Sequence, residues 1–496
     1  MTDGIDMPLH RRSLGVTAFA ASLLATLGRS PASAHDVGPT PEEIKAIEGF
    51  AGSLAMQAAI YGVPLVAMYL LRDTVCFGAA PQAAPNTIWR ISNIATPEIA
   101  RQAGYVTPNV NVVYGFGFMD LGQEPVILRA PDSGGRYYMI ELCDMWTNAF
   151  AYPAGKAAGY GGGTFALVGP GWQGTLPAGV TRIDCPTRWV EVQPRVYVKD
   201  QADLPAAETV LKAITTTGLA AFTGGTAPAP VAYDYIRPRI NPNVASSLMQ
   251  FEDPLQFWDI LSAAMNENRP PAAEIQAVLP QFRYLGLHLG KQWRRTDVPA
   301  PVLAQMKVAA ATIGATTVGA APLISRLVNG WLIPPADIGF AGADYLSRAI
   351  LAVGGLTANT PQEAIYYNAA MDADGHTLDG AKRYTLTFRE PMRYLTPVAP
   401  GFWSVTAYGK VSRLTEPNPI NRYSLGSSDS LVRNPDGSFT LYVQHNDPGL
   451  EKRANWLPVP AGPFYLILRN YAPVPDVVKA LGDPAPFAGP PPLVPA

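Results

Sequence analysis

The sequence has few of the side chains that bind metal ions or form disulfide bonds. Among 496 residues there are only three cysteines and five histidines. An odd and sparse cysteine set excludes a fold held together by disulfides, so we expect Cys76, Cys143 and Cys185 to be buried thiols. No two histidines or cysteines have the spacing of zinc ligands. The sequence therefore predicts no metal ion and no other cofactor.

An excess of charge of either sign is also missing. The chain has 37 basic and 39 acidic residues and a formal net charge of −2, which argues against nucleic acid as a partner. After the N-terminal region, no uninterrupted apolar run reaches the roughly 18 residues of a membrane span, so we expect no transmembrane anchor. Hydrophobic residues make up 48% of the chain, which is enough to build a large packed core.

The first residues have the pattern of a signal peptide. Arg11 and Arg12 precede an apolar stretch from Leu14 to Leu27, and Ala32-Ser33-Ala34 then supplies a small-x-small cleavage site. Leu14 stands where a twin-arginine signal usually has phenylalanine, so both a loose twin-arginine signal and a Sec signal remain open. We predict cleavage after residue 34 and a periplasmic or secreted protein.

The rest of the chain alternates between strand and helix patterns. Thr40, Pro41 and Glu43 predict a capped helix start, and Gly62 and Pro64 are expected to break or kink that helix. The 49 prolines and 45 glycines favour short strands and many turns. Strands are predicted by alternation at 112–118, 137–143, 384–388, 402–408, 439–445 and 464–471. Helices are predicted between 204 and 356, including one with Phe257, Trp258, Leu261, Ala264 and Met265 on its buried face.

Several long motifs resemble a known pair of domains. The runs Pro131–Tyr138, Asp144–Asn148 and Gly169–Trp172 resemble domain of unknown function 1254, and later runs resemble its usual companion, domain of unknown function 1214. The later runs are Asp372–Gly375, Phe402–Val405, Asn418–Ser424 and Asn455–Pro458. The resemblance implies an exported bacterial envelope protein and supplies no agreed reaction. Where related chains often have Asn-x-Asp-Thr-x-Tyr, this chain has Asn111 in place of the acidic residue.

Together, the patterns and the resemblance predict an α+β fold, mainly β, with two jelly-roll-like antiparallel β domains and a helical segment between them. The expected boundaries are a signal peptide at 1–34, a helix and β domain at 35–200, a helical linking layer at 201–360, a β-sandwich at 361–482 and a proline-rich, extended tail at 483–496.

The first candidate site lies on the predicted strand 137–143 and the loop that leaves it. A carboxylate near an arginine and an aromatic ring can bind a polar ligand, and burial can tune its pKa for proton transfer. A structural ion pair that closes the strand end is the alternative. The catalytic candidates are Glu141 and Asp144, with Arg136, Trp146 and Asn148 as substrate-binding candidates.

The second candidate site lies in the predicted C-terminal domain. His445 ends an alternating strand and is the natural proton carrier near pH 7, although a histidine that caps a turn is the common case. Asn421, Arg422 and Trp456 lie in long loops, where binding residues tend to occur. Asp372, Asp374 and Gly375 resemble part of a calcium loop, but the closing glutamate of an EF-hand is missing, which favours a hairpin turn.

These residues lead to one preferred function and two alternatives. The preferred function is an exported enzyme, with a hydrolytic reaction favoured, that acts on a small organic or carbohydrate-like molecule in a cleft between the two β domains. The first alternative is a non-catalytic periplasmic protein that binds a glycan or lipid on exposed aromatic residues. The second is a structural homo-oligomer, which would show a large apolar face and no pocket. If the protein is such an enzyme, the residues of both candidate sites should line the same pocket.

Overall fold

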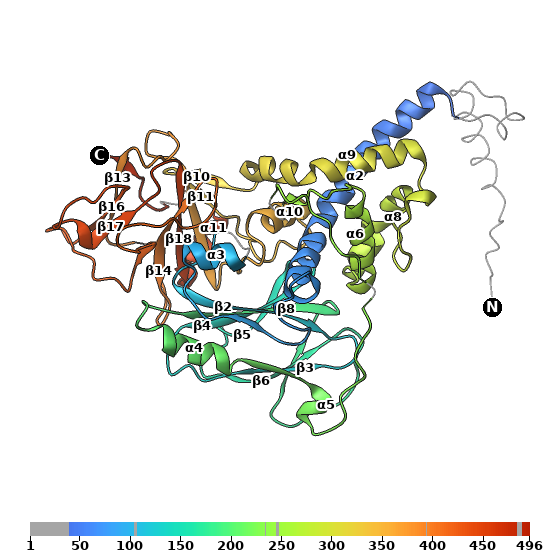
Figure 1. Cartoon of the computed structure of the whole chain (residues 1–496), viewed down its shortest axis with the longest axis horizontal. Helices are drawn as coiled ribbons and strands as arrows, with labels where there is room; N and C mark the ends of the chain where they lie inside the picture. The colour runs from blue at the N-terminus through green and yellow to red at the C-terminus, as the bar shows by residue number, and fades with distance from the viewer. Residues whose placement is uncertain (1–38, 104–106, 234, 245–247, 393, 484–488) are drawn as a thin grey trace, which may run out of the picture.

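The structure is a computed structural model that describes residues 39–496 except 104–106, 234, 245–247, 393 and 484–488. The predicted signal peptide, residues 1–34, lies outside the described residues. Figure 1 shows a two-layered β domain, a group of helices and a second β domain, with the helices and the second domain on the same side of the first.

The first element of the described residues is a long helix, α2 (Pro41–Arg72), followed by a π-helical turn at Asp73–Phe77. The predicted capping box is confirmed, because the Thr40 side chain accepts from the Glu43 backbone and the Glu43 side chain accepts from the Thr40 backbone. The sequence predicts a break or a kink at Gly62 and Pro64; a break is wrong, since the helix continues through both residues. Every residue from 61 to 70 is buried, and this packing offsets the hydrogen bond that Pro64 cannot donate.

Helix packing explains Gly62 as well. A Cβ atom at Gly62 would lie 2.6 Å from Leu261 Cδ2, so the glycine lets α2 approach α6 (Gln256–Glu267) closely. The segment Pro41–Phe77 has the length and apolar composition of a membrane span, but 72% of its most apolar window is buried inside the structure. That burial is the property of a core helix.

The first β domain consists of two sheets packed face to face. One sheet has the strand order β1 (Trp89–Ile91), β2 (Val112–Asp120), β8 (Trp189–Tyr197), β4 (Tyr138–Asp144) and β5 (Ala149–Ala154), all antiparallel. The other has the order β7 (Thr181–Asp184), β6 (Gly163–Val168), β3 (Val126–Ala130) and β9 (Thr215–Gly218), with β6 and β7 parallel. Apolar residues from both sheets form one core between them.

Helices cover the outer face of the five-stranded sheet. Helix α2 packs against α6, α9 (Ala300–Ala320) and α10 (Tyr345–Gly354). The predicted buried face of α6 is confirmed, because Phe257, Trp258, Leu261, Ala264 and Met265 are all buried. The shorter helices are α3 (Pro97–Ala103), α4 (Leu204–Ala213), α5 (Leu219–Phe222), α7 (Ala272–Ala277) and α8 (Leu279–Phe282). Strand β9 lies within residues 201–360, the expected helical linking layer, and pairs with β3 of the first domain.

The second β domain is another pair of packed sheets. The larger sheet has the order β10 (Arg326–Val328), β11 (Trp331–Ile333), β12 (Ala364–Ala369), β18 (Phe464–Tyr471), β14 (Trp403–Gly409) and β15 (Ser424–Gly426). The smaller sheet has the order β17 (Trp456–Pro458), β16 (Phe439–Gln444), β13 (Arg383–Phe388) and β19 (Val494–Pro495). Helix α11 (Pro475–Gly482) follows β18. The end of the proline-rich tail is extended, as predicted, and forms the edge strand β19.

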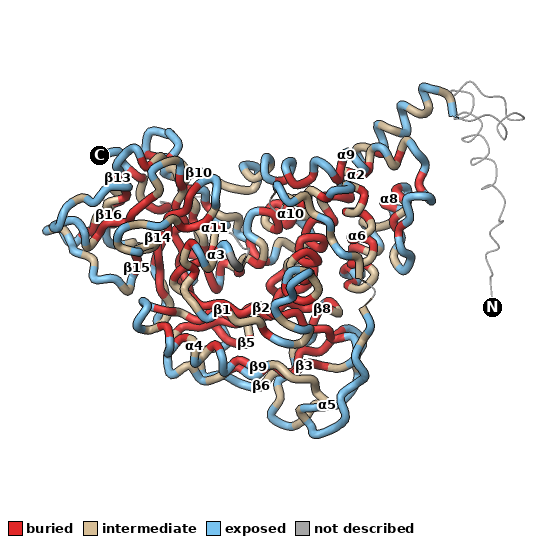
Figure 2. Tube along the Cα trace, viewed as in Figure 1, coloured by how far each residue is buried: buried red, intermediate tan, exposed pale blue. Residues whose placement is uncertain are grey.

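The fold class is α+β, as predicted. Helices account for 29% and strands for 26% of the residues, so the helical contribution is larger than the β-rich composition indicated. Figure 2 shows buried residues inside both β domains and inside the group of helices. The three cysteines are free and buried, which confirms the prediction of buried thiols.

Candidate functional site

Strand alternation places a row of polar side chains on a buried face of the five-stranded sheet. On β8, Val190, Val192 and Val196 point into the core between the two sheets of the first domain. Glu191 and Arg195 have the opposite parity and lie on the face covered by helices and by the second β domain. Glu141 on β4 shares that face, because it is paired with Gln193 of β8. We call this group, with the residues that contact it from the second domain, the interdomain cluster.

Arg195 is the centre of the interdomain cluster. Its Nη2 atom lies 3.2 Å from Glu141 Oε2 and donates to Gln193 Oε1 at 2.6 Å. Nη2 also donates to the carbonyl oxygen of Thr357 at 2.8 Å, and Nη1 lies 3.3 Å from the hydroxyl oxygen of Tyr366 on β12. Tyr366 lies on β12 of the second β domain, and Thr357 lies in the segment between α10 and β12. The Arg195 guanidinium therefore joins the two β domains.

Burial raises the pKa of Glu141 to about 7, against the opposing effect of Arg195. The Glu141 side chain is completely buried, and the Glu363 carboxyl raises the pKa further. Burial also raises the pKa of Glu191 well above its ordinary value, with a contribution from Glu141. Among the described residues, neither oxygen of Glu191 has a hydrogen-bond partner. The cluster therefore holds carboxyl groups that retain protons near neutral pH.

A third carboxyl, Glu363, comes from the other side of the interface. It accepts a hydrogen bond from the Tyr137 hydroxyl at 2.8 Å and another from the Lys156 backbone at 2.9 Å. Burial raises the pKa of Glu363 to about 7, because the opposing hydrogen bonds only partly compensate it. Gly155 has a φ of +139°, and a Cβ there would lie 2.9 Å from the carboxylate, so only glycine leaves room for Glu363.

Of the first group of predicted site residues, only Glu141 lies in the interdomain cluster. Arg136 forms an ion pair with Asp203 at 2.6 Å, at the edge of the first domain. The Asp144 carboxylate accepts from the backbones of Trp146 at 2.8 Å and Asn148 at 2.9 Å, and from the Asn148 side chain at 3.0 Å. Burial raises the pKa of Asp144. Asp144, Trp146 and Asn148 thus form the turn between β4 and β5.

The second group of predicted residues lies at another place in the structure. Arg422 donates to the carbonyl oxygens of Arg453 at 2.7 Å and Trp456 at 2.9 Å, which ties two loops together. Asn421 is exposed. His445 Nδ1 lies 2.9 Å from the carbonyl oxygen of Val459, and His445 lines a hollow that contains none of the other predicted residues. The two predicted groups therefore do not meet at this hollow.

The sequence analysis did not single out Glu191, Arg195, Glu363 or Tyr366. For two of them a signal was available in the sequence, since Glu191 and Arg195 have the same parity in the strand Trp189–Tyr197, whose other face consists of three valines and Pro194. Charged residues two or four positions apart lie on the same face of a strand. When that strand has no exposed face, they indicate that their side chains pair with other polar groups inside the protein. Glu363 and Tyr366 had no such signal, because only the docking of the two domains brings them to Arg195.

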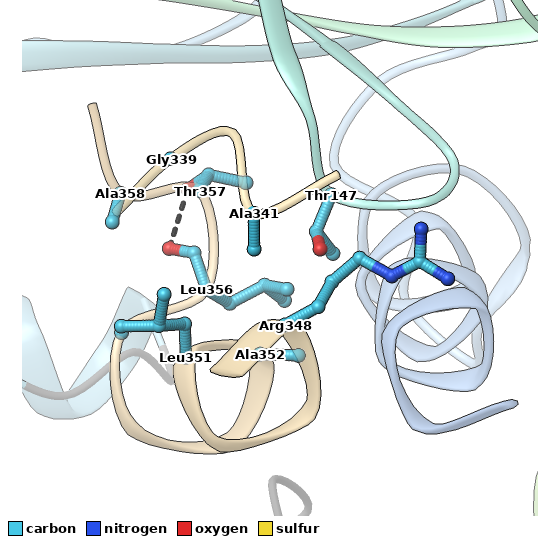
Figure 3. Close-up of a pocket in the computed structure, with 10 residues that line it drawn as sticks. Thr147, Gly339, Ala341, Arg348, Leu351, Ala352, Leu356, Thr357 and Ala358 are labelled. Atoms are coloured by element: carbon cyan, nitrogen blue, oxygen red, sulfur yellow. Dashed lines mark hydrogen bonds between the residues drawn. The ribbon is translucent and has the colours of Figure 1, made fainter. Parts of the chain in front are cut away.

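A small pocket lies beside the interdomain cluster. Figure 3 shows its lining from the loop at Thr147, the loop at Gly339 and Ala341, and helix α10 with Thr357 after it. Its volume of about 10 Å³ holds about one water molecule. Thr357 lines the pocket, and its carbonyl oxygen accepts from Arg195. In Figure 3 the Arg348 guanidinium points away from the pocket toward α2.

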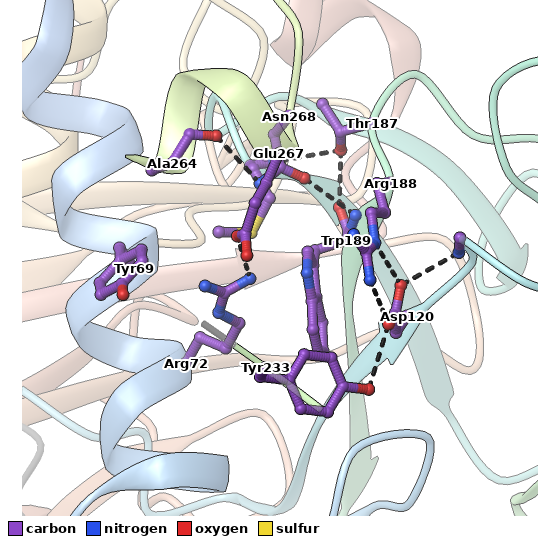
Figure 4. Close-up of polar contacts among 12 residues, drawn as sticks. Tyr69, Arg72, Asp120, Thr187, Arg188, Trp189, Tyr233, Ala264, Glu267 and Asn268 are labelled. Carbon is purple, nitrogen blue, oxygen red and sulfur yellow. Dashed lines mark hydrogen bonds and ion pairs between the residues drawn. The ribbon is translucent and has the colours of Figure 1, made fainter. Parts of the chain in front are cut away.

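A second polar network, shown in Figure 4, is internally paired. Arg188 binds both oxygens of Asp120, at 2.7 and 2.9 Å, and the Tyr233 hydroxyl donates to Asp120 at 3.1 Å. Arg72 pairs with Glu267 at 2.9 Å and lies over the ring of Trp189. These pairs join α2, α6 and the first domain, so we interpret this network as structural.

The predicted turn at Asp372 is present. Asp372 Oδ1 accepts from the backbones of Asp374 at 3.0 Å and His376 at 2.8 Å, which closes the loop. Metal-ligand atoms of Asp372, Asp374 and His376 lie within 4.8 Å of one another, but Asp374 and His376 are exposed. Asp372 Oδ1 is engaged by the turn, while Oδ2 is buried and has no hydrogen-bond partner among the described residues.

Comparison with known proteins identifies the two domains. Residues 85–218 match the family model of DUF1254 and residues 363–475 match that of DUF1214, each described as a protein of unknown function. The chain is thus a protein with a DUF1254 domain followed by a DUF1214 domain, as its motifs predicted. The DUF1254 match covers the first β domain, and the DUF1214 match covers most of the second. Among curated proteins, none matches this sequence significantly.

Two solved structures are similar to the chain. The VPA0106 protein from Vibrio parahaemolyticus is 24% identical, with a TM-score of 0.67 over 90% of this chain and 100% of the other. This similarity shows a shared fold. An uncharacterized protein from Burkholderia cenocepacia is 12% identical, with a TM-score of 0.40 over 87% of this chain and 93% of the other. The comparisons thus establish the domain combination and the fold.

Proposed function

We propose that this protein is an acid–base enzyme whose proton-transferring groups are Glu141 and Glu363 in the interdomain cluster. The observation that supports this proposal is that two buried carboxyls, one from each β domain, both have a pKa raised to about 7. General acid–base catalysis is most effective when the pKa of the catalytic group lies near the working pH. At that pH each carboxyl is present in both its acidic and its basic form.

The surrounding residues suit the binding of an oxygen-rich substrate. Arg195 supplies a buried guanidinium, which can bind a carboxylate or stabilise negative charge on a carbonyl oxygen. Tyr366 supplies a hydroxyl next to it, 3.3 Å from Arg195 Nη1. Because the site is closed to water in this structure, these charges act in a medium of low dielectric constant, where they are stronger than at a surface. Hydrolysis of a small ester, amide or glycoside fits these groups, with the attacking water molecule entering together with the substrate.

We propose that the substrate enters beside Thr357. The pocket in Figure 3 opens beside this residue, whose carbonyl oxygen accepts from Arg195. The pocket as it stands holds about one water molecule, so the substrate must be small or must widen the pocket on binding. The predicted signal peptide would deliver the enzyme to the periplasm or the medium, where it would meet small organic or carbohydrate-like molecules.

A glycan- or lipid-binding protein without catalysis is supported less well. That function calls for a groove of exposed aromatic rings. Among the described residues, the exposed aromatic side chains are Phe50, Tyr284 and Phe340. Phe50 and Tyr284 contact each other with ring centroids 6.4 Å apart, between α2 and the helices near α8, and Phe340 belongs to another loop. Three rings in two places do not form a linear groove.

The experiment is a substrate panel assayed with the purified protein after removal of residues 1–34. Chromogenic esters, amides, glycosides and phosphate esters of small size are tested between pH 5 and 9, and the rate of the best substrate is measured against pH. The variants are Glu141→Gln and Glu363→Gln. Glu451→Gln is the matched control, because Glu451 is exposed and lies outside the interdomain cluster.

We expect each buried variant to lower kcat at least 100-fold, in line with the usual contribution of one acid–base group. The control should retain wild-type activity, and the pH–rate profile of the wild type should change near pH 7. Unchanged activity in both Glu141→Gln and Glu363→Gln would refute the assignment. A panel with no turnover by the wild type would refute a hydrolytic reaction.

A further inference from the structure

The second β domain contains a ligand-sized hollow that shares no residue with the interdomain cluster. Its volume is about 330 Å³, within the range of sites for small molecules. It lies where the start of β13 meets the end of β16, since Arg383 pairs with Gln444 at this end of the sheet. The lining comes from two segments, Gly380–Arg383 and Gln444–Pro448, together with Lys452.

Positive charge dominates the lining of this hollow. Lys382, Arg383 and Lys452 line it and are exposed, and among the described residues none of the three forms an ion pair. The one carboxylate in the lining, Asp447, is paired with Arg453, which lies outside the lining. Three cations around one hollow repel one another unless an anion lies between them.

The orientation of His445 adds a further polar group. Its Nδ1 lies 2.9 Å from the carbonyl oxygen of Val459. Since a carbonyl oxygen only accepts, Nδ1 carries the proton, and Nε2 is left as the second ring nitrogen of a residue that lines the hollow.

One wall of the hollow forms where the backbone at Gly380 lies very close to the backbone at Pro460 and Gly462. A Cβ atom at Gly380 would lie 1.7 Å from the Pro460 carbonyl oxygen, and the Gly380 backbone donates to the Gly462 carbonyl oxygen at 3.0 Å. The glycine therefore lets the segment that carries Lys382 and Arg383 lie against the segment that follows β17. The hollow is thus part of the fold of this domain and does not depend on side-chain positions alone.

We propose that this hollow binds a small anion with two or more negative charges, held by Lys382, Arg383 and Lys452. A compact dianion or trianion of the phosphate or polycarboxylate type fits both the volume and the charge. Citrate and inorganic phosphate are the probes, because they distinguish a polycarboxylate from a phosphate ligand. This site is additional to the acid–base function and does not depend on it.

The test is isothermal titration of the purified protein with each probe at low ionic strength. The variant is Lys382→Gln combined with Lys452→Gln, and the matched control is Lys479→Gln, an exposed lysine on α11 outside the hollow. Both substitutions replace exposed side chains, so the variant should fold, which its circular dichroism spectrum checks. Loss of two charge-assisted contacts should weaken binding at least tenfold, and the control should bind as the wild type does.

Each outcome decides the proposal. Binding of either probe by the wild type and the control, with at least tenfold weaker binding by the double variant, supports it and identifies the type of anion. Absence of binding for both probes overturns it. Equal binding by the wild type and the double variant overturns it as well, because the anion then binds elsewhere on the surface.

Discussion

Replacement of Glu141 by glutamine should make the protein more stable at pH 8 and leave its stability at pH 5 almost unchanged. In the folded state the pKa of Glu141 is raised from 4.5 to about 7 by burial. Between these two values the folded protein keeps the proton that the unfolded chain has released. The free energy of unfolding therefore falls as pH rises through this window, and the stabilisation is fully present only below it.

The size of this effect follows from the shift. Each pKa unit corresponds to about 1.4 kcal/mol, so the ionisation of Glu141 should remove roughly 3 kcal/mol of stability between pH 4.5 and 7. Glutamine cannot ionise. It also fits the site, because Glu141 Oε1 has no hydrogen-bond partner among the described residues, while Oε2 faces Arg195. The amide oxygen of the variant can take the position of Oε2 and the amide nitrogen that of Oε1.

The assay is urea unfolding followed by circular dichroism at pH 5, 6, 7 and 8. The wild type should lose stability with rising pH, and the Glu141→Gln variant should lose less, by about 3 kcal/mol in total. The variant keeps part of the decline, since Glu363 has the same raised pKa. The exposed control Glu451→Gln should follow the wild type. If the wild type and the Glu141→Gln variant decline in parallel, the pKa of Glu141 is not raised and the reasoning fails.

Two further predictions concern the hydrogen bonds around the site and outside it. Tyr137→Phe removes the donor to Glu363, so the pKa of Glu363 should rise further and stability at pH 8 should fall by about 2 kcal/mol. Urea unfolding at pH 8 checks this, and an unchanged midpoint would count against it. The pKa of Asp120 is lowered, because burial, which acts to raise it, is outweighed by the combined effect of the Arg188 hydrogen bonds and charge and the hydrogen bonds from Gly122 and Tyr233. Arg188→Met should therefore cost about 3 kcal/mol at pH 7, and the difference from the wild type should shrink toward pH 3, as the same unfolding assay measures.

The β strands could be predicted from the sequence because the alternation of apolar and polar residues depends only on neighbours in the chain. Strand 464–471 has the predicted bounds, and the predicted strands near Tyr384 and Phe439 differ from the observed ones by one residue at an end. The helix through Pro64 could not be predicted in this way. Its continuity depends on packing against α6, α9 and α10, which are far away in the sequence.

The site was predictable only in part, for the same physical reason. Glu141 stood out as a carboxylate inside an apolar strand, and it does lie at the domain interface. Its partner Arg195 has the same signature on β8. Glu363 and Tyr366, in contrast, lie in a segment where the sequence analysis predicts no particular strand, and their role at the interface arises when the two β domains dock. His445 lies away from this interface, in the hollow of the second domain.

The most direct test of the central claim is the titration of Glu141 itself. The carboxyl carbons of a protein labelled with carbon-13 at the side-chain carboxyl of glutamate are followed by NMR from pH 4 to 9, and the Glu141→Gln variant identifies the signal. We predict a midpoint near pH 7 for Glu141, well above that of the exposed glutamates. A midpoint equal to that of the exposed glutamates would contradict the proposal that the interdomain cluster holds a carboxyl poised for acid–base catalysis.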